Sequence, residues 1–308
     1  YDCFTVGEGP RMEPEVALSY VREGKDKVLD MMINFAHMEA DCFITDFLQR
    51  PFDLVKLKKA FTKWQTKMYG KGWNALYMEN HDHPRIISRY GSEKYRVESG
   101  KSIAASYLFQ RGTPFVYQGQ EIGMINTPLP SLDDYKDIMV KNNARIARSL
   151  GLSKETVLRL AQKASRDNAR TCMQWSGAPN AGFTNGKPWF VVNSNYKDIN
   201  VESQLGDPGS ILNFYRNALQ FRRDNPVVIY GDYVEHMPKS KELYVYERNL
   251  AGKKLLVICS YSEKCVRFDA PEGITLDETK QVFGNYDNNF VISNGFTTRP
   301  YEMRVYLF

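Results

Sequence analysis

The 308 residues are 43% hydrophobic and 13% aromatic, enough to bury the core of one large domain and a smaller one. The 41 Lys and Arg residues against 36 Asp and Glu give a net charge of only +5, and the cations are spread through the predicted helices, which is not typical of nucleic-acid or membrane-surface binding. Because no apolar stretch approaches a membrane span, we expect a folded, soluble, cytoplasmic protein with no membrane or nucleic-acid partner.

In the first 224 residues, short apolar runs alternate with amphipathic patterns, which predicts parallel βα units. We expect strands over 1–7, 30–38, 73–80 and 113–119. Helices are expected to start at Pro14 and to cover 53–68, 97–110 and about 209–223, with a polar helical insertion at 131–174 and an aromatic, glycine-rich loop at 173–189.

From Val227 onward the apolar residues recur with period two, in runs separated by Gly, Pro, Asn and Lys turns. This pattern predicts a separate antiparallel β domain over 225–308, following a domain over 1–224. The five cysteines show no CxxC spacing and no neighbouring histidine cluster, so we expect reduced and mostly packed thiols.

Polar residues follow three of the predicted strands: Glu8, the run Asn80-His81-Asp82, and Gln118 to Glu121. In a parallel βα barrel the C-terminal ends of the strands converge on the active site, so these positions are candidates for chemistry. Each acidic residue alone is more often a helix N-cap or a solvated turn residue.

The loop with Asn80, His81, Asp82 and Arg85 is more informative, because an ionised carboxylate there has charged and hydrogen-bonding neighbours. Such a carboxylate suits stabilisation of positive charge or binding of a polyhydroxyl ligand. A metal site at His81, Asp82 and His83 is the competing interpretation. We expect no metal, because adjacent side chains diverge and no other ligands stand at a recognised spacing.

Four ordered motifs resemble a known family: VGEGP (6–10), NALYMENHDHPRIISRYG (74–91), GTPFVYQGQEIGM (112–124) and RDNARTCMQW (166–175). They are similar to α-amylase-type glycoside hydrolases of family 13, especially the oligo-1,6-glucosidase, dextran glucosidase and α-glucosidase branch. The resemblance implies an α/β fold: the second half of a (β/α)8 TIM barrel, strands five to eight, over 1–224, followed by the antiparallel all-β C-terminal domain over 225–308.

The resemblance also implies roles for individual residues. Glu8 matches the general acid/base at the end of the fifth strand, and Asp82 matches the carboxylate that stabilises the oxocarbenium-like transition state. His81 and Arg170 resemble the residues that bind the sugar in the cleaved subsite, and His83 is expected to have no direct role. Two residues resemble supports for this group: Asn80 and Arg85.

Retaining hydrolysis needs a second carboxylate as nucleophile. In the family it ends the fourth strand, which would lie upstream of Tyr1, so the chain alone is expected to be inactive. We expect no cofactor in this chain, while a calcium site in the missing half is possible. Open sheet edges would pair with the missing half barrel or through self-association.

Three functions fit this pattern. The leading hypothesis is the C-terminal part of an exo-acting α-glucosidase that hydrolyses α-1,6 or α-1,4 bonds of short oligosaccharides. The alternatives are a sucrose isomerase or transglucosylase, and a non-catalytic interaction domain like the ancillary subunits of amino-acid transporters.

Gln120, where relatives usually carry Glu, is expected near the pocket mouth and could alter substrate preference there. Three aromatic residues of the long loop could stack on sugars or pack the loop: Trp175, Phe183 and Trp189.

Overall fold

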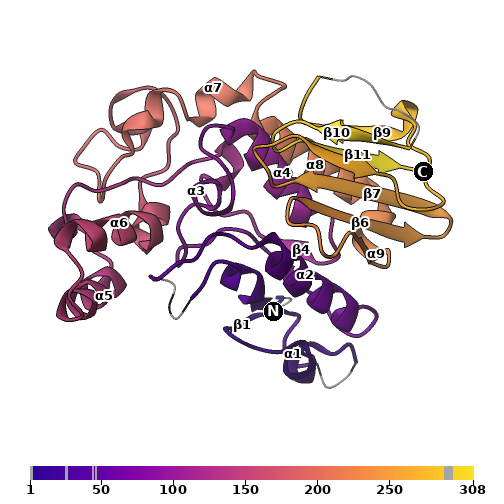
Figure 1. Ribbon diagram of the computed structural model, residues 1–308, viewed down its shortest axis with the longest axis horizontal. Coiled ribbons are helices and arrows are strands. Elements are labelled where there is room, and N and C mark those ends of the chain that lie inside the picture. The colour runs from indigo at the N-terminus through magenta and orange to yellow at the C-terminus, as the bar shows by residue number, and fades with distance from the viewer. Residues whose placement is uncertain (1–2, 25–26, 44, 46, 288–293) are drawn as a thin grey trace.

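The computed structural model describes residues 3–24, 27–43, 45, 47–287 and 294–308. Figure 1 shows a central βα region, a helical insert at one end of the molecule and an antiparallel sheet at the other. None of the described helices is long and apolar enough to cross a bilayer.

Four short parallel strands follow one another in the βα region. β1 (Val6–Gly9) pairs with β2 (Met31–Asn34), Met32 bridges to Asn74, and β3 (Ala75–Leu76) pairs with β4 (Thr113–Pro114). Gly112 permits the close approach of β4 to β3, because its φ is 144° and a Cβ there would lie 2.5 Å from the carbonyl oxygen of Asn74.

Helices connect and cover these strands: α1 (Pro14–Val21), α2 (Leu54–Met68), α3 (Ile86–Tyr90), α4 (Arg96–Leu108), α7 (Val201–Leu205) and α8 (Ile211–Asp224). The predicted helix starts are confirmed, because α1 begins at Pro14 and Asp53 caps α2 by accepting from the amides of Val55 and Lys56. Short 3-10 turns complete this region: η1 (Ala36–Glu39), η2 (Gln120–Ile122), η4 (Arg166–Arg170), η5 (Pro179–Gly182) and η6 (Ser194–Lys197).

The predicted strands were too long. Tyr1 and Asp2 lie outside the described residues, and β1 begins only at Val6, after Thr5, whose amide and hydroxyl donate to Asp30 Oδ2. Glu8 lies within β1 and is its one exposed residue, whereas Val6 and Gly7 are half-buried and Gly9 is buried. The predicted strand over 73–80 contributes only Ala75–Leu76, since the chain then turns into the loop that carries Asp82.

The predicted helical insertion is confirmed. It contains η3 (Leu132–Asp134), α5 (Ile138–Ser149) and α6 (Lys154–Ala164). The two helices share a small hydrophobic core that contains Val140, Val157 and Ala161, and Phe47 from outside the insert joins it. The insert is therefore a packed unit rather than a loose loop.

The C-terminal sheet has the strand order β5-β6-β7-β11-β9, with all pairs antiparallel. Its strands are β5 (Val234–His236), β6 (Leu243–Leu250), β7 (Lys253–Ser260), β9 (Gln281–Gly284) and β11 (Met303–Leu307). A second pair, β8 (Val266–Asp269) and β10 (Gly295–Thr298), covers its outer side, and η7 (Glu278–Lys280) precedes β9.

Alternation along β6 divides its side chains between two cores. Tyr244 and Tyr246 join the large core of the βα region, whereas Leu243 and Val245 face β8 and β10.

The predicted strand starting at Val227 was wrong: Pro226–Tyr230 forms helix α9, with the proline at its first position and Gly231 as its C-cap. A domain boundary between 224 and 225 stays a prediction.

Candidate active site

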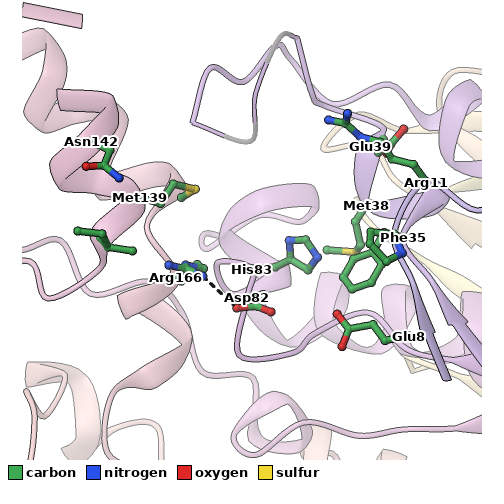
Figure 2. Close-up of a pocket in the computed structure, with 12 residues that line it drawn as sticks. Glu8, Arg11, Phe35, Met38, Glu39, Asp82, His83, Met139, Asn142 and Arg166 are labelled. Carbon is green, nitrogen blue, oxygen red and sulfur yellow. Dashed lines mark hydrogen bonds and ion pairs between the residues drawn. The ribbon is translucent and has the colours of Figure 1, made fainter. Parts of the chain in front are cut away.

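Glu8 of β1 and Asp82 of the loop after β3 line the same cavity, which has a volume of about 400 Å³. Figure 2 shows the two carboxylates on neighbouring walls, with Arg166 reaching Asp82 from the insert. The other lining residues come from the loop after β1, from η1 and its N-cap, from the loop after β3 and from α5: Pro10, Arg11, Phe35, Met38, Glu39, His83, Ile138, Met139 and Asn142.

Asp82 is held by cations and by its own loop. Its Oδ1 accepts from Arg166 Nη1 at 3.3 Å and from Arg170 Nη2 at 3.1 Å, and its Oδ2 lies 3.4 Å from His81 Nε2. Its backbone amide donates to Asn80 Oδ1 at 2.8 Å. The side chain is 32% exposed, so a charged carboxylate is oriented yet open to a ligand.

Arg170 connects Asp82 to a second hollow. Its Nε donates to the carbonyl of His81 at 2.9 Å, which fixes the guanidinium beside Asp82. The second hollow, of about 430 Å³, is lined by residues that follow β4 and by the aromatic loop: Tyr117, Gln118, Glu121, Arg170, Thr171, Cys172, Met173, Trp175, Phe183 and Trp189. The three loop aromatics thus surround one space beside Arg170.

Arg85 lies behind the site loop and does not line the cavity. It is fully buried, with Nη1 3.0 Å from Glu79 Oε2 and 2.7 Å from the carbonyl of Gln118. Glu79 also accepts from the amide of Ile86 at 2.8 Å. Sequence reasoning missed Glu79, although an acidic residue within a buried apolar run is itself a signal of a paired charge. Burial raises the pKa of Glu79, against the opposing effect of Arg85.

The two histidines of the site loop occupy different environments. His81 is 65% exposed and is not among the residues that line the cavity, whereas His83 is buried and lines it. His83 Nδ1 lies 3.3 Å from Arg89 Nη1, and because arginine only donates, the neutral ring carries its proton on Nε2. Burial, together with the charge of Arg89, lowers the pKa of His83 well below its ordinary value.

Gln120 does not reach the pocket mouth, which corrects the sequence-based expectation. Its side chain is buried, and its amide nitrogen lies 3.3 Å from the hydroxyl of Tyr107 and 2.9 Å from that of Tyr215. It is the neighbouring Glu121 that borders the second hollow, and burial raises the pKa of this carboxyl group. The physical reason is the turn of η2, which directs adjacent residues to opposite sides.

Arg166 is a second residue that sequence reasoning missed. It belongs to the motif RDNARTCMQW, but its contact with Asp82 spans 84 residues and has no local signal.

Among the described residues, no group of three or more His, Cys, Asp and Glu side chains is arranged to hold a metal ion.

Residues 1–231 match the family model described as the catalytic domain of alpha amylase. The oligo-1,6-glucosidase of Parageobacillus thermoglucosidasius is 40% identical over 310 residues, which cover 99% of this chain and 55% of that enzyme. The trehalose-6-phosphate hydrolase of Bacillus subtilis (strain 168) is 36% identical over 310 residues, again 99% of this chain and 55% of that enzyme.

Solved structures give the same picture. The trehalose-6-phosphate hydrolase of Bacillus licheniformis superimposes with a TM-score of 0.94 at 39% identity, and the isomaltulose synthase of Klebsiella sp. LX3 with 0.93 at 30%. Each match covers 100% of this chain and 56% of the other. The chain thus spans about half the length of these relatives and has the predicted fold, half of a (β/α)8 barrel followed by an antiparallel β domain.

Proposed function

The chain belongs to the alpha-amylase family of glycoside hydrolases, and we propose that it forms part of an exo-acting α-glucosidase in which Glu8 is the general acid/base and Asp82 stabilises the transition state. The observation that supports this most is the shared cavity: Glu8 and Asp82 lie on its wall, and two arginines orient Asp82. The substrates would be short oligosaccharides with terminal α-1,6- or α-1,4-linked glucose, in keeping with the names of the relatives.

In this mechanism Glu8 donates a proton to the glycosidic oxygen as the bond breaks, and positive charge develops on the sugar ring. Asp82 faces that charge and accepts hydrogen bonds from the ring hydroxyls. Arg170 and His81, which border Asp82, would bind the same sugar, while Asn80 and Arg85 support the loop from behind.

A retaining reaction also needs a carboxylate nucleophile about 5 to 5.5 Å from the acid. We assign that role to no described residue of this chain. Instead we propose that a complementary half barrel supplies it, either on the same polypeptide or on a partner, and that the open side of β1 and the second hollow beside Arg170 face that half. Self-association is the alternative way to cover this side.

A second candidate is transfer of the glucosyl group to another sugar, as in a sucrose isomerase. The superposition on isomaltulose synthases favours it, although the identity of 30% is lower than that to the glucosidases. A non-catalytic role is less well supported, because such a protein has no chemical need for Glu8 and Asp82 on one cavity with Arg170 bound to Asp82.

The test is an assay of the 308-residue chain and of the product of its complete coding region on isomaltose, p-nitrophenyl α-glucoside and sucrose. Glucose release by the latter alone supports the glucosidase proposal. Isomerised sucrose would support the transfer reaction, and no turnover by either protein would refute both.

A further inference from the structure

We propose that Arg166 is a positioning residue that holds the Asp82 carboxylate in place and ties it to the helical insert. This inference rests on the proposed function, in which Asp82 stabilises positive charge on the sugar. Arg166 is distinct from the sugar-binding residues expected from the sequence, and it acts through Asp82.

Asp137 accepts three hydrogen bonds from Arg166. The backbone amide of Arg166 donates to Asp137 Oδ2 at 3.0 Å, while Nε and Nη2 donate to Oδ1 at 3.0 and 2.6 Å. The remaining terminal nitrogen, Nη1, is then directed at Asp82 Oδ1, 3.3 Å away. With two guanidinium bonds and one backbone bond to a carboxylate that is not exposed, the Arg166 side chain has little freedom to leave Asp82.

Asp137 is itself fixed by the insert. It caps α5 by accepting from the amide of Met139 at 2.9 Å, and Asp167 Oδ2 accepts from the amides of Lys136 and Asp137. Although burial opposes ionisation, the hydrogen bonds from Arg166 hold the pKa of Asp137 below its ordinary value. Because α5 also packs against α6 in a separate core, Arg166 stands on a rigid frame.

A second arginine on Asp82 has a clear physical purpose. The χ2 torsion of an aspartate is broad, so a carboxylate held at one point can rotate. Arg170 alone offers one contact to Oδ1, since its Nε is committed to the carbonyl of His81. Arg166, at the other end of the same η4 turn, adds a second donor to Oδ1, while Oδ2 lies 3.4 Å from His81 Nε2.

The test uses the product of the complete coding region with p-nitrophenyl α-glucoside. Because orientation of Asp82 matters most in the transition state, R166Q should lower kcat by about 10- to 100-fold while KM changes by less than about threefold. R166K, which can reach only one carboxylate, should recover little of the lost rate. Added guanidinium should restore part of the rate of R166A, which a purely structural role would not produce.

Two variants control for stability and for the insert. R166Q leaves Asp137 buried and unpaired, so D137N/R166Q should recover the melting temperature but keep the low kcat. R159Q, on the exposed face of α6 with one contact to Thr156, should behave as the unmodified protein.

A kcat of R166Q within twofold of the unmodified protein would overturn the inference. If the unmodified protein turns over no α-glucoside, the proposed function fails. The positioning role of Arg166 is then tested separately by a crystal structure of the R166Q chain. A rotated Asp82 carboxylate would uphold the positioning role of Arg166, and an unchanged carboxylate would refute it.

Discussion

Arg85 and Glu79 form an ion pair of 3.0 Å in which neither side chain is more than 1% exposed, directly behind the loop that carries Asp82. The pair also reaches the carbonyl of Gln118 and the amide of Ile86, so it joins the two polar loops that follow β3 and β4. The candidate site is therefore built on a buried charge pair rather than on a flexible surface loop.

Removing one partner of this pair should be costly. R85M leaves the Glu79 carboxylate buried without a cation, and the free energy of unfolding should fall by about 3 to 5 kcal/mol, measured by urea titration. The double variant E79Q/R85M removes the uncompensated charge and should regain part of this loss. Equal losses in the single and double variants would show that the pair is not the cause.

Asp82→Asn should abolish most turnover while leaving the fold intact. The carboxylate is 32% exposed, and in the proposed mechanism it faces a developing positive charge, so its loss should lower kcat of the complete protein by about 100-fold or more. The melting temperature should shift little. Full activity of D82N, measured on isomaltose, would refute its assignment.

The buried histidines make stability depend on acidity. Burial lowers the pKa of His37 to about 3, so its ring stays neutral in the folded protein but is protonated in the unfolded chain below about pH 6.5. Its contribution to stability is thus present above pH 6.5 and is lost as the pH falls from there toward 3. Between pH 7.5 and 5.5 each such histidine should remove about 1.4 kcal/mol from the free energy of unfolding.

Urea titrations at these two pH values check this. H37N should reduce the loss of stability on acidification, whereas H81N, at an exposed side chain, should leave that loss unchanged. The same pH dependence in H37N as in the unmodified chain would contradict the assignment.

Arg248 joins the C-terminal sheet to the βα region. It donates to the carbonyl groups of Asp232, Phe109, Val228 and Gly231 at 2.6 to 2.9 Å, and burial lowers its pKa to about 10. R248M would leave these acceptors buried without a donor, and the free energy of unfolding should fall by about 3 kcal/mol or more. The exposed R267M, which breaks only a surface ion pair, should cost less than about 1 kcal/mol, and similar losses in both would contradict this account.

The sequence predicts the long helices well because their signals are local. Asp53 and Pro14 mark helix starts that the structure reproduces, and the period-two runs after residue 240 became β6 and β7. The run at Val227 was misread because Pro226 and Gly231 favour a short helix over its β-branched residues.

Long-range contacts explain what the sequence could not reveal about the candidate site. The contact between Arg166 and Asp82 spans 84 residues, and the motif that begins with Arg166 does not by itself indicate this contact. Gln120 and Glu121 are adjacent, and only the geometry of η2 decides which of them borders a hollow. Glu8 and Asp82, both expected from the family motifs, line one cavity, whereas the contacts of Glu79 and Arg166 emerged only from the structure.

The most direct test of the central claim is the leaving-group dependence of E8Q in the product of the complete coding region. If Glu8 is the general acid, kcat/KM for isomaltose should fall by about 100- to 10,000-fold, while p-nitrophenyl α-glucoside, whose leaving group needs no proton, should lose much less. Equal losses on the two substrates, or full activity on isomaltose, would contradict the assignment of Glu8 and with it the proposed role of this cavity.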